Sequence, residues 1–442
     1  MKIQLSDHFT YPKLFCFTLP SIVMMIFTSV YGVVDGFFVS NFVNETAFTA
    51  VNFIMPFLMI LGTLGFMFGT GGSALIAKTM GMGERERANR IFSMLVYVSF
   101  FLGVLIAVVG IFSLRWVAVV LGATGQMLED CVTYGRVILL ALPMFILQME
   151  FQSFFVTAEK PQLGLAVTVA SGVTNMVLDA LLVGVLPGGL VGAAAATAIS
   201  QTVGGAVPLV YFFCKNNSLL RLTRPSFDAQ SLLLTCTNGS SELMSNVSMS
   251  LVGMLYNVQL LRYAGEVGVA AYGVMMYVNM IFLAAFIGYS IGIAPVVSYH
   301  FGARSSRELK SLLRKSAVVI SVLSVAMLLL ALLLAEPLSR IFVGYNEALL
   351  EMAVHGFRIF SFSFLFAGFA IFISGFFTAL NDGLTSALVS FLRTLVFQIA
   401  AVWLLPLIWE LDGIWLSVVF AEMMAALVGF AFLVIKRKKY RY

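Results

Sequence analysis

The chain alternates long apolar stretches with short polar segments from one end to the other. A helix needs about 20 apolar residues to cross a bilayer, and twelve stretches reach that length. They predict membrane-spanning helices at approximately residues 14–40, 51–77, 91–119, 132–158, 162–186, 189–214, 236–262, 270–298, 313–335, 353–380, 384–409 and 413–435. The boundary between the fifth and sixth spans is the least defined, because only VLPGG separates them.

Composition agrees with this pattern. Hydrophobic residues make up 60% of the 442 residues, charged residues 11%, and the mean hydropathy is +1.00. Such a chain is solvated mainly by lipid. The first span is too long for a signal-peptide core, so we expect it to be retained. The four cysteines are scattered without CxxC spacing, which favours reduced, packing side chains over disulfides or a metal site.

The basic residues give the spans an orientation. Twenty of the 26 Lys and Arg lie in the N-terminal segment, the even-numbered loops and the tail KRKKYR. By the positive-inside rule, both termini are expected in the cytoplasm, as an even number of spans requires. The net charge of +5 then follows from topology. We expect no nucleic-acid partner, because no basic patch lies on a soluble fold.

A shift of 221 residues aligns the two halves of the chain. It superposes Gly81 on Gly302, Gly135 on Gly356 and Gly192 on Gly413. We therefore predict an all-α polytopic membrane protein with twelve transmembrane helices in two pseudo-twofold-related six-helix bundles, built as parallel repeats. The predicted units are an N-terminal lobe at 1–214, a cytoplasmic linker at 215–235 and a C-terminal lobe with a basic tail at 236–442.

Polar residues within the N-terminal spans suggest a site. Asp35 lies in an apolar helix, where an ionised carboxylate costs at least about 2.5–3.5 kcal/mol. Asn175 and Asp179 are spaced i, i+4 and share a helix face. Thr197 is as far beyond the turn near Gly188 as Asp179 is before it. Helix geometry thus brings four oxygen-bearing side chains to a similar depth.

Such a cluster suits either a hard monovalent cation such as Na⁺ or a proton shared by two acids. The alternative is a structural clamp in which Asp35 is protonated and hydrogen-bonded. We expect the functional role, because two buried acids cost more than a clamp requires. We expect no cofactor other than the coupling ion.

The C-terminal lobe does not repeat this cluster, since Asp179 corresponds to Ala400. It instead has other polar residues within its predicted spans, namely Glu242, Asn246, Asn257, Tyr289, Arg393 and Gln398. Glu242 either pairs with Arg393 or faces a central cavity and attracts a cationic substrate. For Arg393 we expect a structural role. We expect Glu150 and Glu422 near helix ends or in packed polar contacts, and the three histidines are too far apart for a metalloenzyme motif.

Three segments resemble the multidrug and toxic compound extrusion (MATE) transporters, in particular the bacterial DinF-type and MepA-like branch. They are VYGVVDGFFVSNF, NMVLDALLVGVLPGGLVGAAAATAISQ and NGSSELMSN. The resemblance covers essentially the whole chain and implies export of amphipathic, often cationic drugs, driven by Na⁺ or H⁺ across the bacterial inner membrane. It places Asp35, Asn175, Asp179 and Thr197 on the family's cation site and Pro20 on its first-helix proline.

From these features we predict a monomeric antiporter whose two lobes rock to give alternating access. Cation binding at Asp35 and Asp179 is expected to bend the first helix near Pro20, where a backbone hydrogen bond is missing. The candidate substrate-cavity residues are Glu242, Asn257, Tyr289 and Arg393. The alternative is an exporter or flippase of an endogenous metabolite or lipid-linked substrate. An enzyme is disfavoured because no nucleophile–base pair or metal cluster is evident, and a channel because no filter-like loop repeats.

Overall fold

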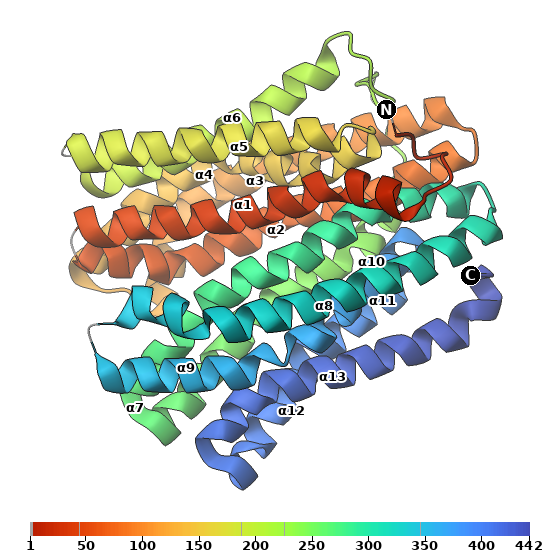
Figure 1. Cartoon of the computed structure of the whole chain (residues 1–442). Coiled ribbons are helices and arrows are strands. Elements are labelled where there is room, and N and C mark those ends of the chain that lie inside the picture. Colours follow the sequence, from red (N-terminus) through yellow and green to blue (C-terminus); the bar gives the residue numbers. More distant parts are fainter. Residues whose placement is uncertain (1–2, 44, 187, 225, 345) are drawn as a thin grey trace.

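The structure is a bundle of long helices that lie side by side (Figure 1). It is a computed structural model that describes residues 3–442 except 44, 187, 225 and 345, with the backbone alone at 36–42, 45–48, 52, 266 and 342. Within the part described, the secondary structure is helical throughout. The predicted all-α class is therefore confirmed.

The first half of the chain forms the six predicted spans. The π-helical segment η1 directly continues α5, so the two together make the fifth span. The elements are α1 (Tyr11–Phe42), α2 (Glu45–Gly81), α3 (Arg85–Leu121), α4 (Gly125–Thr157), α5 (Pro161–Asp179), η1 (Ala180–Val185) and α6 (Gly189–Phe213).

The second half is less regular. Its elements are α7 (Ala229–Gly302), α8 (Ser306–Val343), α9 (Glu347–Ser361), α10 (Phe364–Ala379), α11 (Gly383–Phe391), π-helical η2 (Leu392–Val396), α12 (Phe397–Leu404) and α13 (Pro406–Tyr440). The helix α7 contains the predicted seventh and eighth spans, which meet at a break where Gly265 has a φ of 63°. The tenth predicted span is bent by 50° between α9 and α10.

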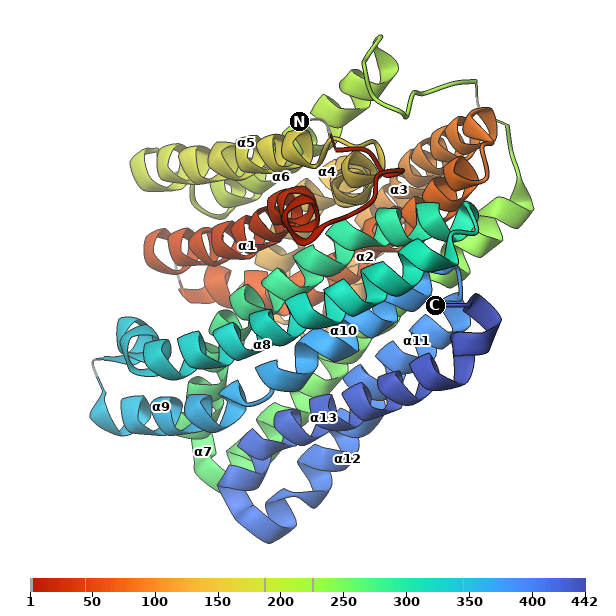
Figure 2. The same ribbon diagram turned by 45° about the vertical axis from the view of Figure 1, so that its right-hand side comes forward.

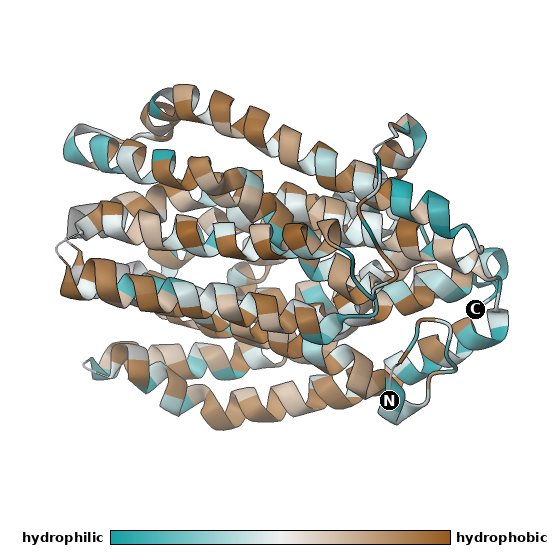
Figure 3. Cartoon of the chain, turned by 90° about the horizontal axis from the view of Figure 1, so that it is seen from above, coloured by the Kyte–Doolittle hydropathy of each residue, from teal (hydrophilic) through white to brown (hydrophobic). Residues whose placement is uncertain are grey.

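Ten helices in the described residues are long and apolar enough to cross a membrane, or eleven if the bent pair counts as one span. The predicted seventh span, 236–262, is helical within α7 but is not among them. Its first half carries the polar run TNGSSELMSN, which lowers its hydropathy. The chain is a multi-pass membrane protein, with hydrophobic residues along the middle of its helices and hydrophilic residues near their ends (Figure 3).

Both termini lie at one end of the bundle, which we call the basic end because the five basic residues of the C-terminal tail are there (Figure 1). Helices α1–α6 pack mainly on one another, and α1 and α2 make the main contacts to the second half, through α7. The two groups of helices diverge away from the basic end (Figure 2). The exact lobe and linker boundaries stay a prediction.

Glycines bring α2 and α7 into backbone contact near the basic end. A β-carbon on Gly81 would lie 2.0 Å from the carbonyl oxygen of Tyr299, and one on Gly302 would lie 2.0 Å from that of Lys78. These two glycines are the ones that the 221-residue shift superposes. Equivalent positions of the repeat therefore make reciprocal contacts across the two halves, and only glycine fits them.

The segment before α1 also connects the two halves at the basic end. The backbone N–H of Leu5 donates to Glu159 Oε1 at 2.7 Å, at the turn between α4 and α5. Three residues later, Nδ1 of His8 lies 2.7 Å from Glu308 Oε1 on α8. This end of the bundle is thus closed by packing and by polar contacts.

Replacing Gly81 by Leu is expected to open the basic end, because any β-carbon there clashes with the backbone of α7. Overpacking of this kind costs about 1–3 kcal/mol, which corresponds to a shift of about 5–150-fold in population. The measurement is the maleimide labelling rate of a single cysteine at buried Ala77 in a background without the native cysteines. Gly273→Leu is the matched control, because Gly273 has nothing within 4 Å of its β-carbon position. Equal labelling of both variants would show that this contact does not hold the lobes together.

Candidate functional site

The hairpin of α5 and α6 holds three of the predicted site residues. Asn175 and Asp179 occupy the last turns of α5 and are 1% and 0% exposed. Directly after Asp179 the helix widens into the π-helix η1. Thr197 lies on α6, which packs against α5.

Asp35 on α1 reaches the same place. The hydroxyl of Thr197 donates to Asp35 Oδ1 at 3.4 Å. The carboxyl group of Asp179 and the side chain of Asn175 also lie close to Asp35. The structure therefore brings together the four residues that spacing and depth had selected.

Three further polar residues surround this cluster and were missed by the sequence analysis. The hydroxyl of Tyr134, from α4, lies beside Thr197 and close to both carboxyl groups. Tyr31 lies near Asp35 and near Gln148 on α4. Tyr31 precedes Asp35 by four residues, so helical spacing could have indicated it. Nothing in the sequence places α4 against α1, so Tyr134 and Gln148 had no such signal.

The cluster has unsatisfied acceptors. Among the described residues, Asn175 Oδ1 and both carboxylate oxygens of Asp179 are buried and receive no hydrogen bond. Buried polar atoms are normally paired, and leaving them unpaired is costly. A proton shared between Asp35 and Asp179, or a hard cation bound by oxygen ligands, supplies what these atoms lack. These oxygen atoms would therefore suit either a shared proton or a hard cation.

Glu150 is a third buried acid of the first half. It lies within α4, away from the helix ends, and is 0% exposed. Its nearest polar neighbour is Ser99 on α3, and neither carboxylate oxygen has a hydrogen-bond donor in the described part of the chain. Of the two expected settings, a helix end or a packed polar contact, the second describes Glu150 better, because α4 extends seven residues beyond it and Ser99 lies near its carboxyl group.

In the second half, a buried ion pair joins Arg393 to Glu422. Nε of Arg393, in η2, donates to Glu422 Oε2 at 2.8 Å and to Oε1 at 3.1 Å. The two side chains are 13% and 6% exposed. Glu242 is close enough to Arg393 to feel its charge but forms no ion pair with it. Of the two alternatives for Glu242, pairing with Arg393 is therefore wrong, because Arg393 pairs with Glu422, 29 residues further along the chain.

The remaining candidates do not gather at one place. Tyr289 is 1% exposed, and its hydroxyl donates to Ser316 at 2.8 Å. Asn257 is exposed on α7, and Pro20 is buried within an uninterrupted α1. Tyr289 thus has a packing role in this conformation, while a substrate role for Asn257 stays a prediction.

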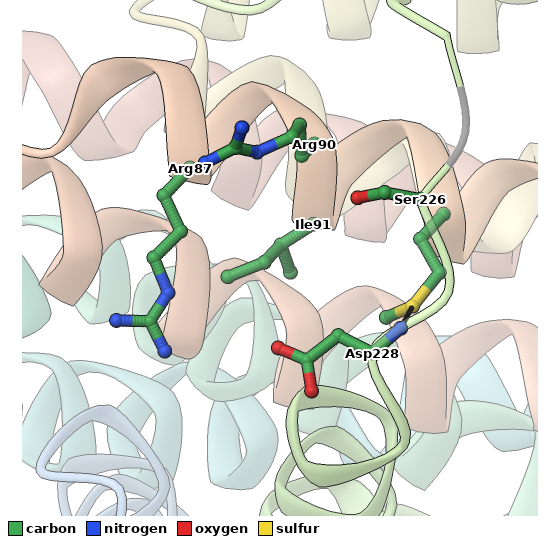
Figure 4. Close-up of a pocket in the computed structure, with 6 residues that line it drawn as sticks. Arg87, Arg90, Ile91, Ser226 and Asp228 are labelled. Atoms are coloured by element: carbon green, nitrogen blue, oxygen red, sulfur yellow. Dashed lines mark hydrogen bonds between the residues drawn. The ribbon is translucent and has the colours of Figure 1, made fainter.

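A separate cavity of about 220 Å³ lies at the basic end, between α3 and the segment that leads into α7 (Figure 4). Arg87 and Arg90 line one side of it and Asp228 the other. Asp228 caps α7 by accepting hydrogen bonds from the backbone of Gln230 and Ser231. This cavity is therefore a feature of the linker, remote from the cluster around Asp35.

Comparison with known families decides the class of the protein. The MatE family model matches residues 20–181 and 243–404. The chain belongs to the MatE family of transporters. The match falls once in each half, as the predicted internal repeat requires. The predicted membership is confirmed.

Relatives and solved structures extend the similarity. The multidrug export protein MepA of Staphylococcus saprophyticus is 24% identical over 93% of this chain and 91% of its own length, and MepA of Staphylococcus aureus gives the same values. A MATE protein crystallised in complex with MaL6 has a TM-score of 0.93 at 22% identity, covering 98% of both chains. An outward-facing multidrug resistance MATE transporter has the same TM-score and identity over 100% of this chain and 98% of its own. These structures share the fold.

Proposed function

We propose that this MatE-family chain is a cation-coupled antiporter that exports amphipathic, often cationic small molecules. The observation that carries this proposal is the cluster of Asp35, Asn175, Asp179 and Thr197, whose buried oxygens lack donors. A permanent structural clamp would satisfy those oxygens with donors of its own. The names of the MepA relatives support drug-like substrates.

Coupling follows from charge. With the site empty, two carboxyl groups face each other at low exposure, so Na⁺ or H⁺ binding is favourable. Binding removes the repulsion between Asp35 on α1 and Asp179 on α5, and the two helices then approach. Helix α1 then bends near Pro20, because proline has no backbone N–H to donate a helical hydrogen bond. Tyr31, held beside Gln148, transmits the movement of α1 to α4.

We assign the basic end to the cytoplasm, with both termini there, because the positive-inside rule requires it. The close α2–α7 contacts at Gly81 and Gly302 then make this conformation closed to the cytoplasm and outward-facing. The return to an inward-facing state requires the lobes to separate at these glycines. We expect the monomer to be the functional unit.

The second candidate is export of an endogenous metabolite or a lipid-linked phosphate on the same fold. A phosphate-bearing substrate needs cationic side chains in the membrane part of the cavity. Arg393 lies deep in a span but is neutralised by Glu422. This pairing favours cationic or neutral substrates over anionic ones.

The deciding experiment is efflux of a cationic dye from proteoliposomes under a Na⁺ gradient and a proton gradient imposed separately. We expect one gradient to drive transport and the other to have little effect, which also identifies the coupling ion. Efflux that neither gradient accelerates would contradict antiport. Liposomes with Asp35→Asn protein are the control for leakage of dye.

A further inference from the structure

A second cavity at the basic end has a strongly cationic lining. It has a volume of about 500 Å³ and lies between the start of α8 and the end of α13. Its lining consists of four basic residues and two hydroxyl-bearing ones, namely Lys310, Arg437, Lys438, Arg441, Ser306 and Tyr442. The volume is typical of ligand sites, which range over about 300–1,000 Å³.

No side-chain carboxylate among the described residues pairs with the cations of this cavity. The two nearby acids are occupied elsewhere, Glu308 by His8 at 2.7 Å and Asp382 by Lys436 at 2.8 Å. Four like charges around one cavity produce a positive potential that attracts an anion.

The tail is folded back on the bundle, with its basic residues lining the cavity. Tyr442 is 4% exposed, and its hydroxyl donates to the carbonyl of Leu433 at 2.9 Å. The hydroxyl of Tyr440 donates to Asp382 Oδ2 at 2.7 Å. Between the two tyrosines, Arg441 adopts a left-handed φ of 56°, which turns the chain back on itself. A tail that only tethered positive charge to the membrane would not need this structure.

Asp382 anchors the tail as a charged group. Burial raises the pKa of its carboxyl group, but hydrogen bonds from Lys436 and Tyr440 more than offset this, so its pKa lies below the usual range. The tail is therefore held at neutral pH. Lys436 donates a hydrogen bond to Asp382, whereas the next two residues, Arg437 and Lys438, line the cavity.

The surroundings indicate that the anion belongs to a lipid. Val434 and Ile435, within one turn of Arg437, are 76% and 71% exposed, as apolar residues facing acyl chains are. The first turn of α8 receives no side-chain cap from Ser305, and amides at a helix N-terminus favour a phosphate. The cavity thus combines a phosphate-binding lining with an apolar border.

We propose that the cavity lined by Lys310, Arg437, Lys438 and Arg441 binds the phosphate headgroup of an anionic phospholipid. The lipid bridges α8 and α13, whose ends move when the C-terminal lobe rocks. This site is distinct from the drug-exporting route and goes beyond the proposed antiport.

The test compares two variants of the full chain with the same loss of charge. The cavity variant carries Lys310→Gln, Arg437→Gln and Arg441→Gln. The matched control carries Arg304→Gln, Arg307→Gln and Lys439→Gln, three exposed basic residues of the same region that do not line the cavity. Binding is measured by native mass spectrometry and by thermal stability in detergent micelles doped with phosphatidylglycerol, phosphatidylcholine or inorganic phosphate.

We expect phosphatidylglycerol to bind and stabilise the native and control proteins. Its affinity for the cavity variant should be lower by at least about tenfold, since hydrogen bonds to charged groups are lost. Equal weakening in both triple variants would reduce the effect to general charge attraction and overturn the site. Equal stabilisation by inorganic phosphate, with the same dependence on the variants, would overturn the assignment to a lipid. The single variant Arg441→Gln, at an exposed position, repeats the test if the triple variant does not fold. None of these measurements involves transport, so they are independent of the proposed function.

Discussion

Replacing Asp35 by Asn is expected to lower gradient-driven efflux by at least about 100-fold, since losing even an outer-shell partner of a bound ion costs about 10–100-fold. The side chain keeps its size and can still accept the hydrogen bond from Thr197. What it loses is the charge that, together with Asp179, binds the coupling ion. The measurement is dye efflux from proteoliposomes, with dye binding followed separately by fluorescence polarisation.

The matched control is Asp412→Asn, which removes a carboxylate whose side chain is 50% exposed and pairs with His355. It should transport normally. The double variant Asp35→Asn/Asp179→Asn should be no worse than Asp35→Asn alone, because residues that act as one unit are not additive. Undiminished transport by Asp35→Asn, with folded protein, would contradict the coupling role.

Replacing Glu422 by Leu is expected to lower the free energy of unfolding by about 3–5 kcal/mol, because it leaves the guanidinium of Arg393 buried without its partner. Replacing both members of a buried pair by apolar residues is often nearly neutral. The double variant Arg393→Met/Glu422→Leu should therefore recover most of the lost stability. Thermal and denaturant unfolding of the purified protein in detergent measures both effects.

Glu242 supplies the internal control for this cycle. It lies near Arg393 without pairing with it, so Glu242→Gln should change stability much less than Glu422→Leu. The reverse order would make Glu242 the effective counter-ion and restore the pairing that the sequence suggested. No recovery in the double variant would show that the loss comes from packing around Glu422.

The resemblance to MATE transporters is visible in the sequence because the motifs that show it are short and continuous. The segment with Asn175 and Asp179 and the one that follows the turn lie within 30 residues of one another, and helix geometry fixes which face they share. The internal repeat is visible because equivalent glycines recur in the two halves of the chain. At positions that contact a neighbouring backbone, no residue with a β-carbon fits. The backbone contacts of Gly81 and Gly302 explain physically why this spacing recurs in the two halves of the chain.

The seventh span shows where hydropathy falls short. Residues 236–262 are predicted as a span, yet they begin with a polar run and do not reach the hydropathy of the ten helices that are apolar enough to cross a membrane. Buried neighbours on α2 stabilise this stretch, as the contact of Gly239 with the Met67 carbonyl shows. Its membrane position thus depends on protein packing as well as on its own composition.

The sequence by itself indicated the class, most of the approximate spans, the internal repeat and the cluster of Asp35, Asn175, Asp179 and Thr197, because each follows from composition or from spacing along a helix. Only the tertiary structure decided that Tyr134 joins that cluster, that Arg393 pairs with Glu422, and that the tail folds over a basic cavity. The physical reason is the apolar surroundings. A helix in lipid is hydrophobic on its lipid-facing side as well as on its packed side, so the sequence pattern does not fix its rotation. Contacts between distant helices depend on that rotation, and packing sets it.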